Sequence, residues 1–136
     1  MTETGTAKRR RVLIVEDSPA MRHLLALAVK RVPGIEIEQA ADGVAALKAM
    51  KSAQAEPYDL VLLDLNMPVM DGMKLLGKVR EDPAFARTTV CVVTTEESEE
   101  AERQARALGA RHFIRKPVNR RTVEKILAEV FGLPPE

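Results

Sequence analysis

The residues best suited to chemistry in this sequence stand at or just after its short apolar runs. Six of them carry a carboxylate, hydroxyl or ammonium group: Glu16, Asp17, Asp64, Thr94, Thr95 and Lys116. Each has an ordinary explanation when it is taken alone, because aspartate is common in turns and a lysine is normally solvated. Their occurrence together indicates a site that binds a cation and a phosphoryl group.

The three acidic residues predict a divalent metal site. Carboxylates crowded at one place repel one another, and a hard cation relieves that repulsion. Oxygen ligands favour Mg²⁺ or Ca²⁺ over softer metals. The sequence has no Ca²⁺-loop pattern, and Mg²⁺ prefers one or two carboxylates beside a phosphate oxygen, so we expect Mg²⁺. Asp64 is then the nucleophile that forms an acyl phosphate, Lys116 shields the transferred oxygens, and Thr94 donates a hydroxyl hydrogen bond to them.

Alternating strands and helices must bring these groups together. Apolar runs predict strands at 12–15, 35–37, 60–63, 90–93 and 113–114, and helical patterns fill 19–31, 43–51, 72–80, 97–108 and 119–131. Crossovers of this length favour a parallel sheet that is covered by helices on both faces. Parallel strands all end at one edge of the sheet, where ligands of open α/β sheets bind. We therefore expect the six polar residues to meet at that edge.

Length and composition indicate one domain and argue against several classes of protein. The chain has 136 residues, a formal net charge of +1 and a single cysteine, so it can form no intrachain disulfide and shows no charge bias toward nucleic acid. No apolar run approaches the roughly 18 residues of a membrane span, which predicts a cytoplasmic protein without membrane insertion. We expect a domain at 11–132 between tails at 1–10 and 133–136. The basic run at residues 8–11 is interpreted as solvated charge before the first strand.

Four segments of the sequence resemble the receiver domain of bacterial two-component response regulators, in particular the single-domain CheY-like type. These segments are VLIVEDSPAMR at 12–22, LLDLNMPVMDG at 62–72, VVTT at 92–95 and FIRKP at 113–117. The resemblance spans about residues 11–131. It implies a doubly wound, flavodoxin-like (CheY-like) α/β fold, in which five helices flank a five-stranded parallel sheet of strand order 2-1-3-4-5.

The resemblance also implies a role for each matching residue of the metal and phosphorylation site. Asp64 is the expected phosphoacceptor. Glu16 and Asp17 are the expected metal-side acids, although aspartate is commoner than glutamate at the first of these positions. Asn66 is expected to offer its backbone carbonyl to Mg²⁺.

Further residues match the family's conformational switch. Thr94 is expected to move toward the phosphoryl group while Phe113 changes rotamer, and Pro117 is expected to follow a cis peptide bond beside Lys116. Thr95 stands where the family usually has alanine or glycine. We expect its side chain to narrow access to the phosphorylated aspartate and to slow loss of the phosphoryl group.

The function that follows is that of a stand-alone receiver in a phosphorelay or chemotaxis-type signalling pathway. The expected donor is a histidine kinase or phosphotransfer protein, and the expected target is a protein that binds the fourth helix, fifth strand and fifth helix. The chain would not be an enzyme beyond self-catalysed phosphorylation and slow autodephosphorylation. Two alternatives are a Mg²⁺-dependent phosphohydrolase, which usually has a second aspartate where Asn66 stands, and a degenerate receiver that works without phosphorylation.

Overall fold

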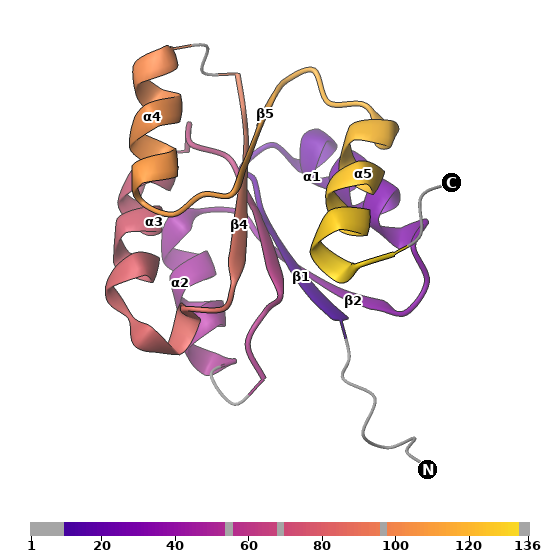
Figure 1. The fold of residues 1–136 in the computed structure, drawn as a ribbon, viewed down its shortest axis with the longest axis horizontal. Helices are drawn as coiled ribbons and strands as arrows, with labels where there is room; N and C mark the ends of the chain where they lie inside the picture. The colour runs from indigo at the N-terminus through magenta and orange to yellow at the C-terminus, as the bar shows by residue number, and fades with distance from the viewer. Residues whose placement is uncertain (1–9, 54–55, 68–69, 96–97, 134–136) are drawn as a thin grey trace.

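A five-stranded parallel sheet lies between two layers of helices in the computed structural model of the protein (Figure 1). The structure describes residues 10–53, 56–67, 70–95 and 98–133. The strands are β1 (Arg10–Val15), β2 (Ile35–Ala40), β3 (Leu60–Leu63), β4 (Thr89–Thr94) and β5 (His112–Arg115). The helices are α1 (Pro19–Lys30), α2 (Gly43–Ser52), α3 (Gly72–Glu81), α4 (Glu99–Ala107) and α5 (Arg120–Phe131), with a short 3₁₀ turn, η2 (Pro83–Phe85), before β4.

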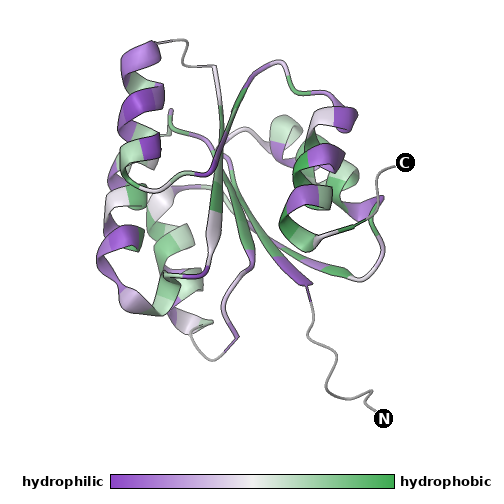
Figure 2. Cartoon of the chain, viewed as in Figure 1, coloured by the Kyte–Doolittle hydropathy of each residue, from purple (hydrophilic) through white to green (hydrophobic). Residues whose placement is uncertain are grey.

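The strand order is β2-β1-β3-β4-β5 and every neighbouring pair is parallel, which confirms the predicted fold. Successive residues of a strand point to opposite faces of the sheet. Leu13 and Val15 of β1 accordingly pack under α2, α3 and α4, whereas Val12 and Ile14 pack under α1 and α5. Figure 2 shows the resulting apolar centre of the sheet and the polar outer surfaces of the helices.

Side-chain caps fix where the helices begin. The predicted caps Ser18, Asp71 and Asn119 each accept a hydrogen bond from a backbone N–H of the first turn, at 3.2, 2.8 and 2.9 Å. The helix that we predicted at 97–108 begins at Glu99, because the hydroxyl of Ser98 accepts from two N–H groups of the first turn. Position 97 lies outside the described residues.

A buried arginine lies near the edge of the sheet where the strands begin, away from the polar residues that follow the strands. Its burial was not predicted from the sequence. Arg11, which we took for solvated charge, is only 7% exposed. Its guanidinium pairs with Glu36 at 2.9 Å and Glu38 at 3.0 Å and lies 4.5 Å from the ring centre of Tyr58. The Tyr58 hydroxyl donates to Glu38 at 2.5 Å, and burial together with this carboxylate raises the pKa of that hydroxyl. Arg11 is therefore a buried member of a network that ties β1 to β2 and to the start of β3, and the carboxylates of that network are partly exposed.

The predicted tails lie almost wholly outside the described residues, which exclude 1–9 and 134–136. Arg10, which we assigned to the first tail, is instead the first residue of β1, paired with Ile35, and its guanidinium lies 5.5 Å from the ring centre of Phe131. Within the described ranges, none of the helices has the length and apolar character that a bilayer crossing requires.

A close approach at Gly72 yields a stability prediction. A Cβ at this position would lie 2.3 Å from the carbonyl oxygen of Asp64 and 2.7 Å from Cα of Leu65. Gly72→Ala should therefore lower the free energy of unfolding by about 1–3 kcal/mol, since backbone must move to make room. Urea denaturation checks this.

Gly77 provides the matched control for that substitution. It lies in the same helix, and a Cβ at this position would have no atom within 4 Å apart from its chain neighbours and the backbone of its own helix. Gly77→Ala should stabilise the protein by about 0.5–1 kcal/mol, because alanine loses less conformational entropy in a helix. Equal losses for the two substitutions would contradict the close approach at Gly72.

Candidate functional site

The backbone carries the polar residues past the ends of the strands in a fixed register. The N–H of Glu16 donates to the carbonyl of Ala40 at 3.1 Å, and the N–H of Asp64 donates to Val15 at 3.0 Å. On the other side of the sheet, the N–H of Lys116 donates to the carbonyl of Thr94 at 2.8 Å. These bonds extend the sheet by one residue at each place. The side chains that follow the strands therefore start from fixed points along its edge.

Three carboxylates converge at this edge, as the sequence predicts. Oxygens of Glu16, Asp17 and Asp64 all lie within 4.8 Å of one another. Glu16 and Asp64 are buried, with side chains 1% and 5% exposed, whereas Asp17 faces solvent. Two buried acids and one open acid of this kind suit a hard cation that keeps some of its water, and the donor set fits Mg²⁺.

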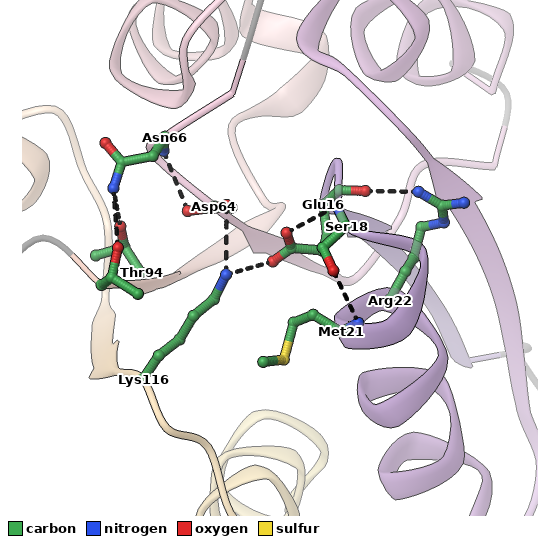
Figure 3. Close-up of polar contacts among 9 residues, drawn as sticks. Glu16, Ser18, Met21, Arg22, Asp64, Asn66, Thr94 and Lys116 are labelled. Carbon is green, nitrogen blue, oxygen red and sulfur yellow. Dashed lines mark hydrogen bonds and ion pairs between the residues drawn. The ribbon is translucent and has the colours of Figure 1, made fainter.

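Lys116 supplies the positive charge that the two buried carboxylates require. Its Nζ lies 2.7 Å from Oε1 of Glu16 and 3.4 Å from Oδ2 of Asp64 (Figure 3). Burial alone would lower the pKa of this lysine. Its hydrogen bond to Glu16 and the charge of Asp64 outweigh burial and raise the pKa, so the ammonium form persists at neutral pH.

Glu16 is held from both sides of its carboxylate. Oε1 accepts from Lys116, and Oε2 accepts from the backbone N–H of Ser18 at 3.1 Å. Burial, with a contribution from the nearby charge of Asp64, nevertheless raises the pKa of Glu16, because the two hydrogen bonds offset only part of the desolvation. The site therefore keeps two acidic groups close together against their mutual repulsion.

The side chain of Asn66 makes contacts that the sequence interpretation did not include. Its backbone N–H donates to Oδ1 of Asp64 at 3.1 Å, while its side-chain Nδ2 lies 3.3 Å from the hydroxyl of Thr94 and 3.2 Å from that of Thr95. Figure 3 shows the amide turned away from the carboxylates and toward β4. The amide thus connects the loop after β3 to the end of β4. The expected role of the Asn66 carbonyl toward a metal stays a prediction.

The two residues expected to form a switch lie at different depths. Thr94 is fully buried at the end of β4, whereas Phe113 of β5 is half-buried and packs against the core beneath α4. The guanidinium of Arg115 lies 5.4 Å from the ring centre of Phe113 and 3.4 Å from a carboxylate oxygen of Glu102. Phe113 is thus covered by an ion pair that joins β5 to α4. The peptide bond between Lys116 and Pro117, beside this strand, is cis.

The structure also places Arg22 of α1 at the site, which sequence reasoning missed. Its Nη1 donates to the backbone carbonyl of Glu16 at 2.8 Å, and its Nε donates to the side-chain oxygen of Gln39 at 3.2 Å. No spacing rule identifies this contact, because a helical arginine six residues after an acid usually faces solvent. Only the folded position of α1 against the end of β1 brings the two groups together.

Comparison with known proteins identifies relatives of this chain. The family model of the response regulator receiver domain matches residues 12–128. A probable chemotaxis protein CheY of Rhizobium etli is 32% identical over 126 residues, which cover 93% of this chain and 95% of that protein. Among solved structures, a chain of the CheX–CheY–BeF₃–Mg²⁺ complex of Borrelia burgdorferi matches with a TM-score of 0.83 and 30% identity, over 95% of this chain and 94% of that one.

Other relatives are much longer than this chain. A gliding motility regulatory protein of Myxococcus xanthus is 36% identical over 114 residues, which cover 84% of this chain but 14% of that protein. A protein-glutamate methylesterase/protein-glutamine glutaminase of Cereibacter sphaeroides is 36% identical over 131 residues, or 96% of this chain and 34% of that protein. In these proteins the similarity is limited to a fraction of the sequence.

The charge balance around Lys116 yields a second stability prediction. Lys116→Met would leave Glu16 and Asp64 buried and facing each other without a cation. Without Mg²⁺, we expect the free energy of unfolding to fall by about 3 kcal/mol or more, as is usual when one member of a buried ion pair is removed. The loss should shrink toward low pH, because protonation of Glu16 removes one of the two charges. Denaturation at several pH values checks this.

The control for this prediction is Lys78→Met, which removes an exposed lysine of α3. Surface substitutions of this kind usually change stability by no more than about 0.5 kcal/mol. If the two variants lost similar stability at neutral pH, Lys116 would not be the group that offsets the buried acids.

Proposed function

Since the chain belongs to the response regulator receiver family, we propose that it accepts a phosphoryl group on Asp64 with the help of Mg²⁺ and thereby changes its affinity for a protein partner. One observation carries this proposal. Three carboxylates and an ammonium group from three distant parts of the sequence meet at the carboxyl edge of the sheet, with oxygens of Glu16, Asp17 and Asp64 all within 4.8 Å of one another.

Asp64 has the geometry of a nucleophile. Its Oδ1 accepts the N–H of Asn66 and its Oδ2 faces Lys116 at 3.4 Å, so each oxygen keeps a lone pair for another partner. We propose that one of these oxygens attacks the phosphorus of a phosphohistidine. The new P–O bond then forms as the P–N bond breaks, and the electron pair of that bond remains on the departing imidazole nitrogen.

The neighbouring residues offset the charge that arrives with the phosphoryl group. Mg²⁺, held by Glu16, Asp17, Asp64 and the backbone carbonyl of Asn66, would neutralise developing charge on the transferred oxygens. Lys116 contacts Oδ2 of Asp64 whereas Asn66 contacts Oδ1, and the ammonium group can donate to a phosphoryl oxygen. Its longer contact is the one to Asp64, so a small shift of Nζ toward the phosphoryl group need not break its 2.7 Å bond to Glu16.

The response to phosphorylation would pass through Thr94 and Phe113. The Thr94 hydroxyl accepts from the amide of Asn66, and we propose that it moves toward a phosphoryl oxygen and donates its O–H to it. That movement would open space toward Phe113, whose cover is the ion pair of Arg115 with Glu102. We propose that the inward rotamer of Phe113 rearranges this ion pair and so remodels the face made by α4, β5 and α5.

The pathway that best suits this activity is a two-component or chemotaxis-type pathway. We propose a histidine kinase or phosphotransfer protein as donor and a protein partner on the α4–β5–α5 face. The similarity to a probable CheY over 95% of its length supports the stand-alone type of receiver. The two alternatives agree less well with the site. A phosphohydrolase would need a carboxylic acid where Asn66 offers an amide, and a degenerate receiver would have no use for the complete set of acids, hydroxyl and ammonium.

The proposed phosphorylation is tested by incubating the protein with Mg²⁺ and acetyl phosphate and measuring its intact mass. We expect one phosphoryl adduct on the wild type and none on Asp64→Asn or after chelation of Mg²⁺. Rapid release of many equivalents of phosphate would support the phosphohydrolase instead. An absence of any adduct on the wild type would support the degenerate receiver and refute the proposal.

The contact of Asn66 with Thr95 motivates a prediction about the lifetime of the phosphorylated state. Thr95 is exposed, and its hydroxyl lies 3.2 Å from Nδ2 of Asn66. Thr95→Ala should open the access of water to the phosphorylated aspartate and speed dephosphorylation by about fivefold, the equivalent of one hydrogen bond of about 1 kcal/mol. The decay of the adduct after removal of acetyl phosphate gives the rate.

Thr89→Ala is the control, because Thr89 begins the same strand at the opposite edge of the sheet. It should leave the rate of dephosphorylation unchanged. The proposed role of Thr95 would be wrong if Thr95→Ala decayed at the wild-type rate.

A further inference from the structure

Within the described residues, the side chain of Asp17 makes no contact that would fix its orientation. Its carboxylate belongs to the three-acid cluster but is exposed, and within the described residues it makes no hydrogen bond or ion pair. Glu16, in contrast, is fixed by Lys116 and by the N–H of Ser18. The backbone that precedes Asp17 therefore sets the point and direction from which its side chain starts.

Arg22 holds that backbone. The peptide group between Glu16 and Asp17 presents its carbonyl to the guanidinium of Arg22, at 2.8 Å from Nη1 (Figure 3). The guanidinium is itself anchored at Nε by the side-chain oxygen of Gln39, at 3.2 Å. A planar group with two fixed contacts allows the carbonyl little rotation. Arg22 also belongs to the first turn of α1, where its N–H donates to the carbonyl of Ser18 at 2.9 Å.

We propose that Arg22 is a positioning residue, which orients Asp17 for divalent-metal binding by clamping the Glu16 carbonyl from α1. This inference rests on the proposed metal-assisted function. Arg22 touches no reacting atom and acts through the peptide that it holds. Partners that fix a metal ligand in this indirect way typically change metal affinity by about 10- to 100-fold when they are removed.

The positive charge of Arg22, acting alone, predicts the opposite change in Mg²⁺ affinity, so an experiment can distinguish the two effects. Arg22 is a positive charge beside an acidic cluster, so its removal by itself would strengthen the attraction of the cluster for a cation. Loss of the clamp would weaken the binding. The sign of the change in Mg²⁺ affinity therefore separates the two mechanisms.

The experiment is a titration of the full chain with Mg²⁺, followed by amide NMR shifts because the chain contains no tryptophan. We expect Arg22→Ala to bind Mg²⁺ about tenfold more weakly than wild type and Arg22→Lys to fall between them, since lysine keeps the charge and one donor. Lys30→Ala removes an exposed charge from the last turn of the same helix and should leave the affinity unchanged. Unchanged or tighter binding by Arg22→Ala would overturn the proposal.

Two further measurements separate positioning from a loss of structure. Gln39→Ala removes the outer anchor of the guanidinium while leaving its charge, and it should weaken Mg²⁺ binding less than Arg22→Ala does at an unchanged thermal midpoint. In an Asp17→Asn background, Arg22→Ala should cause little additional loss, because both substitutions then act on the same ligand. A full additional loss in that background would overturn the route through Asp17.

Phosphorylation by acetyl phosphate gives an independent measurement. The rate for Arg22→Ala should be reduced at low Mg²⁺ and should recover at saturating Mg²⁺, whereas a general distortion of the site would not be rescued. If wild type itself showed neither Mg²⁺ saturation nor an adduct, the proposed function would fail. If wild type showed both and Arg22→Ala matched it at every Mg²⁺ concentration, only the role of Arg22 would fail.

Discussion

The buried ammonium group of Lys116 is the interaction on which the site depends. Glu16 and Asp64 end adjacent strands, and the parallel register leaves their carboxylates side by side at one edge of the sheet. Taking such charges out of water is unfavourable unless a countercharge and hydrogen bonds accompany them. Lys116 provides the countercharge from the far side of the sheet, after β5. The fold thus brings together groups that would separate if any of three strands were displaced.

The positive and negative charges at the site do not balance. One ammonium group faces two buried acids and one exposed acid, so the site retains negative charge. Burial, with a smaller contribution from the charge of Asp64, raises the pKa of Glu16. Such a surplus favours a divalent cation. A divalent cation bound there would, together with Lys116, balance the three carboxylates and so offset their repulsion of a phosphoryl group. The same surplus of negative charge lowers the intrinsic stability of this edge and favours the proposed binding of Mg²⁺.

Most of the fold and the convergence of the site could be predicted from the sequence, because both follow from strong local patterns. Continuous apolar runs marked the buried strands, and Ser18, Asp71 and Asn119 marked helix starts that the structure confirms. Parallel connections then required the strand-end residues to share an edge. The strand order came from the resemblance to receiver domains, and the structure confirms it.

Contacts made by long polar side chains across the fold could not be predicted in the same way. Arg11 was interpreted as solvated charge and Arg22 was assigned no contact, yet the first is buried against Tyr58 and the second reaches the Glu16 carbonyl. An arginine can extend its guanidinium far from its backbone, and its partners depend on how the helices and strands pack. The amide of Asn66 is a similar case, since its bridge to two threonines requires knowledge of where β4 ends.

The edge of the sheet around Arg11 is held firmly, whereas helix α4 is held less firmly, and this difference suits a switch. Arg11 ties β1, β2 and the start of β3 together at the edge away from the site, so this part of the sheet can stay fixed. Helix α4 is held by the Ser98 cap, by the pairs of Glu100 with Arg103 and Glu102 with Arg106, and by the ion pair of Glu102 with Arg115 of β5. Its single buried residue within the described range is Ala105. A helix that is thinly anchored to the core can shift more easily than a deeply buried one, which agrees with the proposed route from Thr94 to the surface.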